Sequence, residues 1–370
     1  MRKITLILIS IIINCIFMSG CFSYRDINKI LFVTGIIIDI DKENNPIVYC
    51  EAFKGKTGPA KGGGKEEKII FKGTGKTCFE AIRNISLRSS YKLNYTQNKI
   101  IIFSAKAAEY GLDNFIDFFD RDQELIIRPL ISVYDGNCDI LMQTQLDEEN
   151  YLGVYIVQLI KNVRTSSRAI ELSLHKYLNQ RLIGDKTNVV PVIELKTDMG
   201  NKLTISGGAI IKEDKMVGVI KKEEGQGFNF LMDSVKSGTL EPKNPQAKGK
   251  FTTLEILDSN TKTDIKYDEN KIKLIKNIKV KTSLGEVQEK FIIRDNSLRA
   301  LKMTTEANIK NACETIFNKY KEEGIDVFDI QEEFYRKYPK EKIDDAIKVT
   351  DLIVNVEVEI LISGDTSDFF

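Results

Sequence analysis

Residues 66 to 84, EEKIIFKGTGKTCFEAIRN, hold the pattern most suggestive of chemistry: a glycine turn followed by Lys76 and Thr77. A phosphate-binding loop has a glycine, four residues and then Gly-Lys-Ser/Thr, because that spacing points successive backbone N–H groups at the phosphates. Counting back five residues from Gly75 reaches Ile70, inside an apolar run typical of a strand. The turn is too short to enclose a pyrophosphate. We therefore interpret the segment as a strand, a tight turn and the start of a structural helix.

The other residues that could act as acids or bases lack the catalytic or metal-binding partners that they would need. His175 lies in a helical pattern, and a triad or metal site would require partners that the sequence does not supply. Asp39 and Asp41 flank a turn, where carboxylates usually cap or solvate a hairpin. The sequence contains neither G-x-S-x-G nor H-E-x-x-H. We predict a chain that is not an enzyme and holds no cofactor or metal.

The first 21 residues, MRKITLILISIIINCIFMSGC, are typical of a bacterial lipoprotein signal peptide. Their apolar run, residues 4–18, is shorter than the roughly 20 residues that span a bilayer. Small residues just before a cysteine resemble a lipobox, although Met18 stands where leucine is usual, and a simple secreted protein would rarely place a cysteine next. We predict that residues 1–20 are removed and that Cys21 carries the lipid, which tethers an otherwise soluble chain to a membrane.

The four cysteines that remain after Cys15 and Cys21 lie far apart in the sequence. No C-x-x-C pair or Cys/His cluster is present, so neither a zinc site nor a disulfide framework is indicated. A chain of this length can also build its core without crosslinks. We expect buried thiols at Cys50, Cys78, Cys138 and Cys313.

The charge balance excludes nucleic acid as a partner on electrostatic grounds. The chain has 54 Lys+Arg against 53 Asp+Glu, whereas nucleic-acid binding usually needs a basic excess. The lysine-rich run KIKLIKNIKVK, residues 271–281, alternates, with Ile272, Leu274, Ile278 and Val280 on one face. This pattern predicts a half-buried strand with outward lysines. A lipid-headgroup site remains the alternative for those lysines.

The first half of the chain alternates strands and helices. We expect a hairpin over residues 30–54, a loop at 55–68, helices from Thr77 and over 107–122, strands at 99–104 and 128–136, and one long helical stretch from about Asn150 to Arg181. This order predicts an α/β layer.

The second half is mostly strands. A hairpin turning at 213–215 precedes strands at 251–257, 263–267, 271–283 and 286–293. A helix over about Thr305–Glu323 carries apolar residues on one face and should dock on that sheet. We predict an α+β fold with mixed and antiparallel sheets and helices packed on their faces. Its domains are predicted at 21–200 (α/β) and 201–368 (α+β), the latter either as one lobe or divided near residue 245 into two.

Several short motifs occur in an order that resembles the Ger(x)C family, the lipoprotein C subunits of GerA-type spore germinant receptors. They are the opening CFSYRDINKILFVTGIIIDIDKE, the helix GKTCFEAIRN, GLDNFIDFFDRDQEL with DGNCDIL, and GGAIIKEDKMVGVI, SGTL, GIDVFDIQEEFYRKYP and VNVEVEI in the second half. Departures from the family pattern are Phe22 for tryptophan, Asp26 for glutamate, Gln97 for a frequent histidine, and Ile126 and Ile127 for arginines.

The resemblance implies a three-lobed α+β architecture and a non-enzymatic role in nutrient-triggered germination. It implies a location on the outer face of the spore inner membrane, held by acylated Cys21, beside membrane-spanning A and B subunits. We predict that Phe22, Arg25 and Asp26 form a contact patch for those partners. The alternative is a lipid-anchored solute-binding protein, which the antiparallel second half disfavours because such proteins show repeated βαβ units in both lobes.

Overall fold

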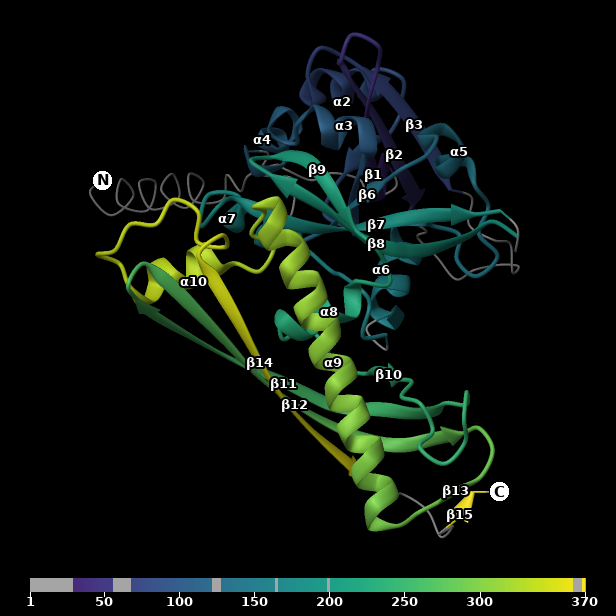
Figure 1. Cartoon of the computed structure of the whole chain (residues 1–370). Helices are drawn as coiled ribbons and strands as arrows, with labels where there is room; N and C mark the ends of the chain where they lie inside the picture. Colours follow the sequence, from purple (N-terminus) through teal and green to yellow (C-terminus); the bar gives the residue numbers. More distant parts are fainter. Residues whose placement is uncertain are drawn as a thin grey trace, which may run out of the picture.

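The computed structural model describes residues 29–55, 68–121, 128–163, 166–197, 200–361 and 368–369. They form two large sheets, one above the other in Figure 1, with helices packed against both. The upper sheet has the strand order β3-β2-β1-β5-β6-β7-β8-β9, with β4 beside β1, and the lower sheet has the order β10-β11-β12-β14. The predicted α+β fold with mixed and antiparallel sheets is confirmed.

The upper sheet begins with the predicted hairpin, β1 (Ile30–Ile40) and β2 (Pro46–Lys54), and β3 (Ile69–Thr74) extends it antiparallel to β2. The Asp41 carboxylate accepts backbone hydrogen bonds from Glu43 at 2.9 Å and Asn45 at 2.8 Å, which closes the turn. The capping role expected for this aspartate is confirmed.

The middle of the upper sheet is parallel and covered on both faces. Its strands are β1, β4 (Lys92–Asn94), β5 (Ile100–Ser104), β6 (Leu130–Tyr134) and β7 (Thr187–Lys196). One face carries α2 (Cys78–Ser86), α3 (Ala105–Tyr110), α4 (Asp113–Arg121) and α7 (Leu174–Gln180). The other carries α5 (Cys138–Gln143) and α6 (Leu152–Val163). The predicted α/β layer is confirmed.

The upper sheet continues past residue 200 with the hairpin β8 (Lys202–Lys212) and β9 (Lys215–Ile220), where β8 pairs with β7. Glu213 and Asp214 form its tight turn with φ of 48° and 66°, and two positive φ angles are the geometry of a two-residue hairpin turn. This sheet therefore contains strands from both sides of residue 200, where the sequence placed its division.

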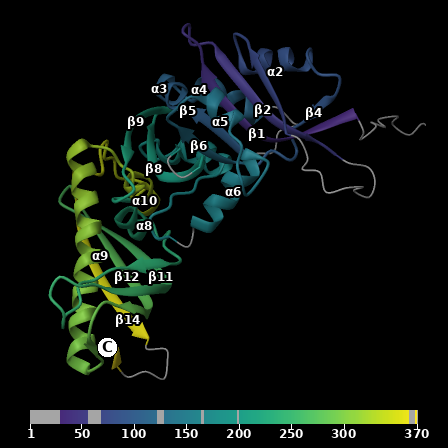
Figure 2. The ribbon, with the colours of Figure 1, turned by 90° about the vertical axis from the view of Figure 1, so that its right-hand side faces the viewer.

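The lower sheet contains β10 (Gly238–Leu240) and two long strands, β11 (Thr252–Asp268) and β12 (Lys271–Val287), with β14 (Thr350–Leu361) parallel to β12. The 29-residue helix α9 (Asp295–Glu323) runs along it (Figure 2). Lys321 pairs with Asp351 at 3.1 Å, and the Glu306 carboxylate accepts the Val358 N–H at 2.9 Å. The helix therefore shields the edge strand, which limits pairing with another chain.

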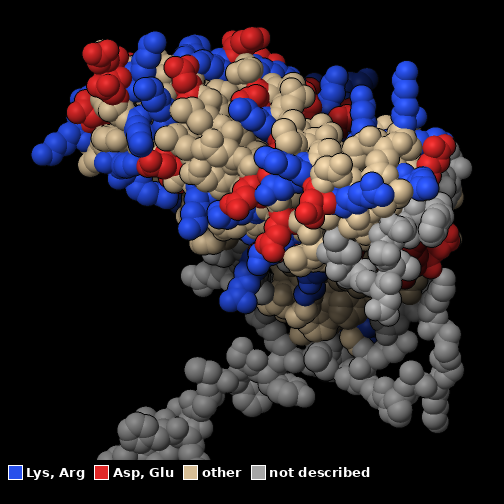
Figure 3. Space-filling model, turned by 60° about the horizontal axis from the view of Figure 1, so that its bottom comes forward, with Lys and Arg blue, Asp and Glu red and all other residues tan. Residues whose placement is uncertain are grey.

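Four lysines of β12 lie on the outer face of the lower sheet, as the alternation predicted: Lys271, Lys273, Lys279 and Lys281. Lys279 pairs with Glu357 on the neighbouring strand at 2.7 Å. Viewed from the lower end of the molecule, basic and acidic side chains are interspersed (Figure 3). These lysines are thus a solvated strand face.

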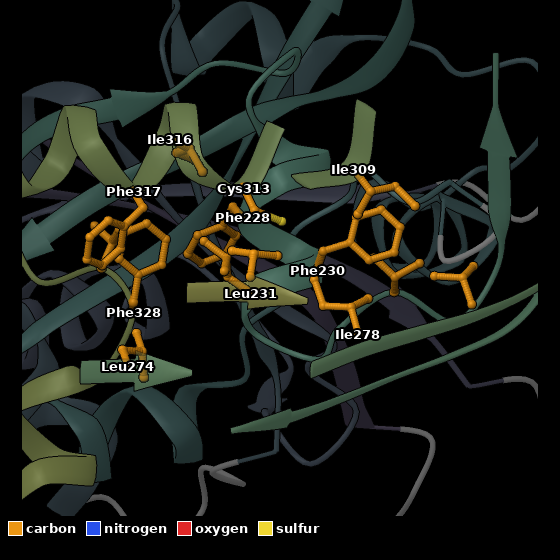
Figure 4. Close-up of a cluster of buried hydrophobic side chains, with 14 of the residues drawn as sticks. Phe228, Phe230, Leu231, Leu274, Ile278, Ile309, Cys313, Ile316, Phe317 and Phe328 are labelled. Atoms are coloured by element: carbon orange, nitrogen blue, oxygen red, sulfur yellow. The ribbon is translucent and has the colours of Figure 1, made fainter. Parts of the chain in front are cut away.

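The inner face of the lower sheet packs on α9 and on α8 (Gly225–Leu231). Figure 4 shows Phe228 and Phe230 of α8 between α9 and β12, where Leu274 and Ile278 complete the cluster. Residues Val189, Ile210 and Ile220 of the upper sheet belong to the same core. The remaining elements are α10 (Ile330–Lys337) and the short pair β13 (Phe291–Ile292) and β15 (Asp368–Phe369).

Some predicted boundaries were wrong. The helical stretch expected over 150–181 is two helices, α6 and α7, because residues 166–172 are not helical and run against α8, whose Asn229 donates to the carbonyl oxygens of Ser167 and Ala169. The strands expected at 251–257 and 263–267 are one strand, since a bulge at Ile256–Asp258 lets β11 continue. Helix α9 begins ten residues earlier than predicted. The helix expected over 107–122 is two, since α3 ends at Gly111.

Candidate functional site

The predicted site residues Cys21, Phe22, Arg25 and Asp26 lie outside the described residues, which begin at Lys29. The structure does describe where the following chain joins the fold. Ile30 opens β1, and it pairs in parallel with Lys92 of β4 while Leu31 pairs with Lys54 at the end of β2. The chain therefore enters the upper sheet at the edge where β1 and β4 begin. In Figure 2 this edge lies on the opposite side of the molecule from α9.

We call this surface the amino edge and define it by Lys29, Lys54, Leu87, Arg88, Tyr91 and Lys92. Helix α2 ends there, and Leu87 is 85% exposed. The Lys54 ammonium donates to the Tyr91 hydroxyl at 2.7 Å and lies 4.8 Å from its ring centroid. The Arg88 guanidinium donates to the Lys72 carbonyl oxygen at 3.5 Å. The amino edge thus combines basic groups with an exposed apolar side chain.

A groove of about 800 Å³ lies next to the amino edge, between α2 and α4. Phe79 of α2 meets Phe118 of α4 edge to face, with ring centroids 6.0 Å apart, and Arg83 lies 5.0 Å above the Phe79 ring. Lys92 of β4 also lines it. Its walls are therefore aromatic with charged rims, which suits contact with an amphipathic surface.

The Gly-Lys-Thr motif forms the N-terminus of helix α2, as predicted. The Thr77 hydroxyl accepts the Glu80 N–H at 3.1 Å, and the Glu80 carboxylate accepts the Lys76 N–H at 2.7 Å. These side chains occupy backbone N–H groups that a phosphate would need. A Cβ on Gly73 would lie 2.3 Å from the Ala81 carbonyl oxygen, so this glycine allows α2 to pack against β3.

The Val-Thr-Gly motif of the opening segment joins β1 to helix α6 through a buried carboxylate. Glu51 of β2 is fully buried and accepts the N–H groups of Leu152 at 2.8 Å and Gly153 at 3.1 Å and the Thr34 hydroxyl at 2.8 Å. Burial raises the pKa of Glu51, although these bonds oppose the shift. A Cβ on Gly153 would lie 2.1 Å from the Thr34 carbonyl oxygen. The motif therefore fastens a helix N-terminus to the sheet.

Lys276 is a buried charge that sequence reasoning missed. It is 5% exposed, and its ammonium donates to the Leu231 carbonyl oxygen at 2.8 Å and the Thr263 hydroxyl at 2.9 Å. Burial lowers its pKa. The signal was present, since Lys276 stands in phase with the inward residues Leu274 and Ile278.

Acidic groups gather where the two sheets meet. Asp185, before β7, accepts the Asp326 N–H at 3.2 Å and pairs with Lys212 at 3.2 Å. Burial raises the pKa of Asp326 to about 6 and that of Asp329 to about 7. A cavity of about 450 Å³ lies beside this junction, lined by Lys176, Asp329 and residues of β7 and α8.

The structure also describes the other residues that the sequence singled out. His175 is exposed on α7, as expected, with Nε2 3.3 Å from the Asn179 amide nitrogen. The four cysteines expected to be buried are free thiols inside the fold: Cys50, Cys78, Cys138 and Cys313. Asp39 has one carboxylate oxygen that is buried without a hydrogen-bond partner, and it lies over a small cavity of about 120 Å³. Within the described ranges, no group of three or more His, Cys, Asp and Glu side chains is arranged to hold a metal ion.

No helix among the residues that the structure places is both long enough and apolar enough to cross a bilayer.

Comparison with known proteins agrees with the order of motifs. Residues 23–195 match the family described as "Spore germination protein N-terminal domain", and residues 206–364 match "Spore germination B3/ GerAC like, C-terminal". The chain is 22% identical to "Spore germination protein GerQC" of Bacillus cereus, over 96% of this chain and 98% of that protein. It is 20% identical to "Spore germination protein B3" of Bacillus subtilis (strain 168), over 93% and 94%.

A solved structure shares the fold. "Crystal Structure of the GerBC protein" superposes with a TM-score of 0.59 and 17% identity, covering 88% of this chain and 97% of that one. The two family models follow each other along the described sheets, the first ending in β7 and the second beginning in β8. The chain therefore belongs to the Ger(x)C family of spore germination proteins.

Proposed function

We propose that this chain is the lipid-anchored C subunit of a spore germinant receptor and acts by binding membrane-spanning A and B subunits during nutrient-triggered germination. The observation that carries the proposal is the match of both family models, in order, over residues 23–195 and 206–364. The segment that precedes them resembles a lipobox. The proposed location is the outer face of the spore inner membrane.

Cys21 is the proposed lipidation site. A single acyl chain gives marginal membrane binding, whereas two or more hold a protein stably, and a diacylglyceryl group supplies at least two. The chain from Cys21 to Lys29 covers eight peptide steps, so it reaches at most about 28 Å. The folded body would thus stay close to the bilayer.

Phe22, Arg25 and Asp26 are the proposed contact patch for the partners. They fall within this short linker, where a membrane-spanning partner emerging from the same bilayer can meet them. Confinement to the membrane raises the effective concentration of the two surfaces. Contact then shifts the conformational equilibrium of the partner toward the state that the contact favours. The mechanism is non-enzymatic.

Replacing Cys21 tests the proposal. Cys21→Ala should lose incorporation of radioactive fatty acid, leave the membrane fraction and impair germination. Cys15→Ala is the matched control, because this residue leaves with the signal peptide. A Cys21→Ala chain that stays with membranes and supports germination would contradict the anchoring role. Co-purification of wild type with a multi-spanning protein from spore membranes tests the receptor assignment separately.

The 450 Å³ cavity between the sheets favours one alternative, a lipid-anchored solute-binding protein, because ligand sites are often found at domain junctions. A saturable thermal shift of the purified mature chain with a small molecule, without any co-purifying partner, would support that alternative.

A further inference from the structure

The described segments that form the amino edge carry basic residues and no acidic ones. The segments that form it, residues 29–31, 53–55 and 85–93, contain Lys29, Lys54, Arg88 and Lys92 and no Asp or Glu. The bonds described for Lys54 and Arg88 go to neutral oxygens, the Tyr91 hydroxyl and the Lys72 carbonyl, so these contacts leave both charges uncompensated. The chain as a whole is nearly neutral, with 54 basic against 53 acidic residues. This local excess is therefore a feature of the edge and not of the composition.

Leu87 adds an apolar group to this basic surface. At 85% exposure it is the most exposed of the large hydrophobic side chains among the described residues. It follows the last turn of α2, directly before Arg88. Basic side chains around a protruding apolar one are the pattern of surfaces that lie in a membrane interface, where the charges meet headgroups and the apolar group enters the acyl boundary.

The chain that follows Cys21 joins the described fold at the amino edge. Ile30 pairs with Lys92, so the segment that descends from Cys21 joins the fold within the amino edge itself. If Cys21 is acylated, as proposed above, at most about 28 Å of chain separates the lipid from Lys29. Of the described residues, Lys29 and its neighbours in the amino edge are therefore the closest to the lipid along the chain.

We propose that the amino edge docks directly on the anionic surface of a phospholipid bilayer. The lipid at Cys21 keeps the chain at the membrane, and the basic groups with Leu87 set which side of the upper sheet faces it. The lower sheet then projects away from that contact, since α9 and the amino edge lie on opposite sides of the molecule (Figure 2). This inference rests on the proposed anchoring for its geometry, but the surface itself is testable without the lipid.

The test uses the full mature chain with Cys21→Ser, so that acylation plays no part. Co-sedimentation is measured with vesicles of phosphatidylcholine alone and with vesicles in which phosphatidylglycerol replaces part of it. We expect binding only with phosphatidylglycerol, and weakening as salt is raised. The double variant Arg88→Glu/Lys92→Glu should bind at least about tenfold more weakly, because each basic side chain near such a surface strengthens binding about fivefold. Leu87→Ser should weaken binding without changing its salt dependence.

The matched control is Lys271→Glu/Lys273→Glu, which makes the same charge change on exposed positions of β12. It should bind vesicles like the parent chain, and thermal melting should show all variants folded. Equal binding to both kinds of vesicle, or equal weakening by the control, would overturn the inference. So would unchanged vesicle binding of Arg88→Glu/Lys92→Glu, even with impaired germination, since the surface would then serve a protein partner. Fatty-acid labelling of the wild type reports on the anchor independently.

Discussion

The buried carboxylate of Glu51 gives the sharpest test of how this fold is held together. It is fully buried on β2, where three donors converge on it: two backbone N–H groups that open α6 and the Thr34 hydroxyl. Glu51→Ala removes the only acceptor that the structure shows for these N–H groups at that end of the helix. A buried donor left unsatisfied costs about 1–3 kcal/mol. Allowing for partial relaxation, we expect Glu51→Ala to lower the free energy of unfolding by about 3–5 kcal/mol.

Glu51→Gln separates hydrogen bonding from charge. It keeps one accepting oxygen and turns an amide N–H₂ toward the donors, so we expect a loss of about 1–3 kcal/mol. Burial raises the pKa of Glu51 above its ordinary value of 4.5. The folded chain therefore binds more protons than the unfolded chain between 4.5 and the folded pKa, and wild-type stability falls as pH rises through that window. The difference in the free energy of unfolding between wild type and Glu51→Gln should therefore become smaller as pH rises through the same window.

Urea unfolding followed by circular dichroism measures these free energies, and hydrogen exchange of peptides covering α6 reports the local effect. Glu43→Ala is the control, because Glu43 is an exposed glutamate on the adjacent hairpin turn. It should change stability by less than about 0.5 kcal/mol. If Glu51→Ala behaves like this control and α6 keeps its protection, the carboxylate does not fasten the helix.

Two further ionisable groups, Asp329 and Lys276, give predictions for stability. Because the pKa of Asp329 is raised to about 7, the folded chain loses stability as pH rises from about 4 to 7, by up to roughly 4 kcal/mol. Asp329→Asn should remove this loss, so that it melts higher than wild type at about pH 8 and not at about pH 4; identical pH profiles would contradict the assignment. Lys276→Met keeps the volume and removes a buried ammonium, so its free energy of unfolding at neutral pH should change by no more than about 1 kcal/mol. Lys276→Glu places a carboxylate near Asp326 and Asp329 and should cost more than about 3 kcal/mol; equal urea midpoints for the two variants would refute this.

Local patterns predicted most elements because the physics that sets them is local. The alternation over 272–280 placed β12 and its buried face correctly, and the Thr77 cap with the glycine turn placed α2. The same alternation placed Lys276 among the inward-facing positions. Because we expected the lysines of this run to face outward, its burial was not predicted. Only the tertiary contacts with Leu231 and Thr263 make that burial possible.

Boundaries failed where distant contacts decide them. The polar run at 258–262 is typical of a turn, yet a bulge absorbs the irregularity and β11 continues through it because β12 pairs with it throughout. The break between α6 and α7 depends on Asn229, far along the chain, which bonds the carbonyl oxygens of Ser167 and Ala169. Ser173, which caps α7 by accepting the Lys176 N–H, was a local signal for the restart.

The packing between the two sheets determines whether contact of the amino edge with a membrane also fixes the orientation of the lower sheet. The core of the lower sheet includes Val189, Ile210 and Ile220 from the upper one, so part of the contact is packed like a domain interior. Lys212 also bridges the two, donating to the Gly324 carbonyl oxygen at 3.3 Å while pairing with Asp185. Shared apolar packing resists sliding, because cores are close-packed and have few alternative arrangements. If the amino edge lies on the bilayer, the orientation of the lower sheet is therefore fixed by the same contact, and a partner that binds there meets it at a defined angle to the membrane.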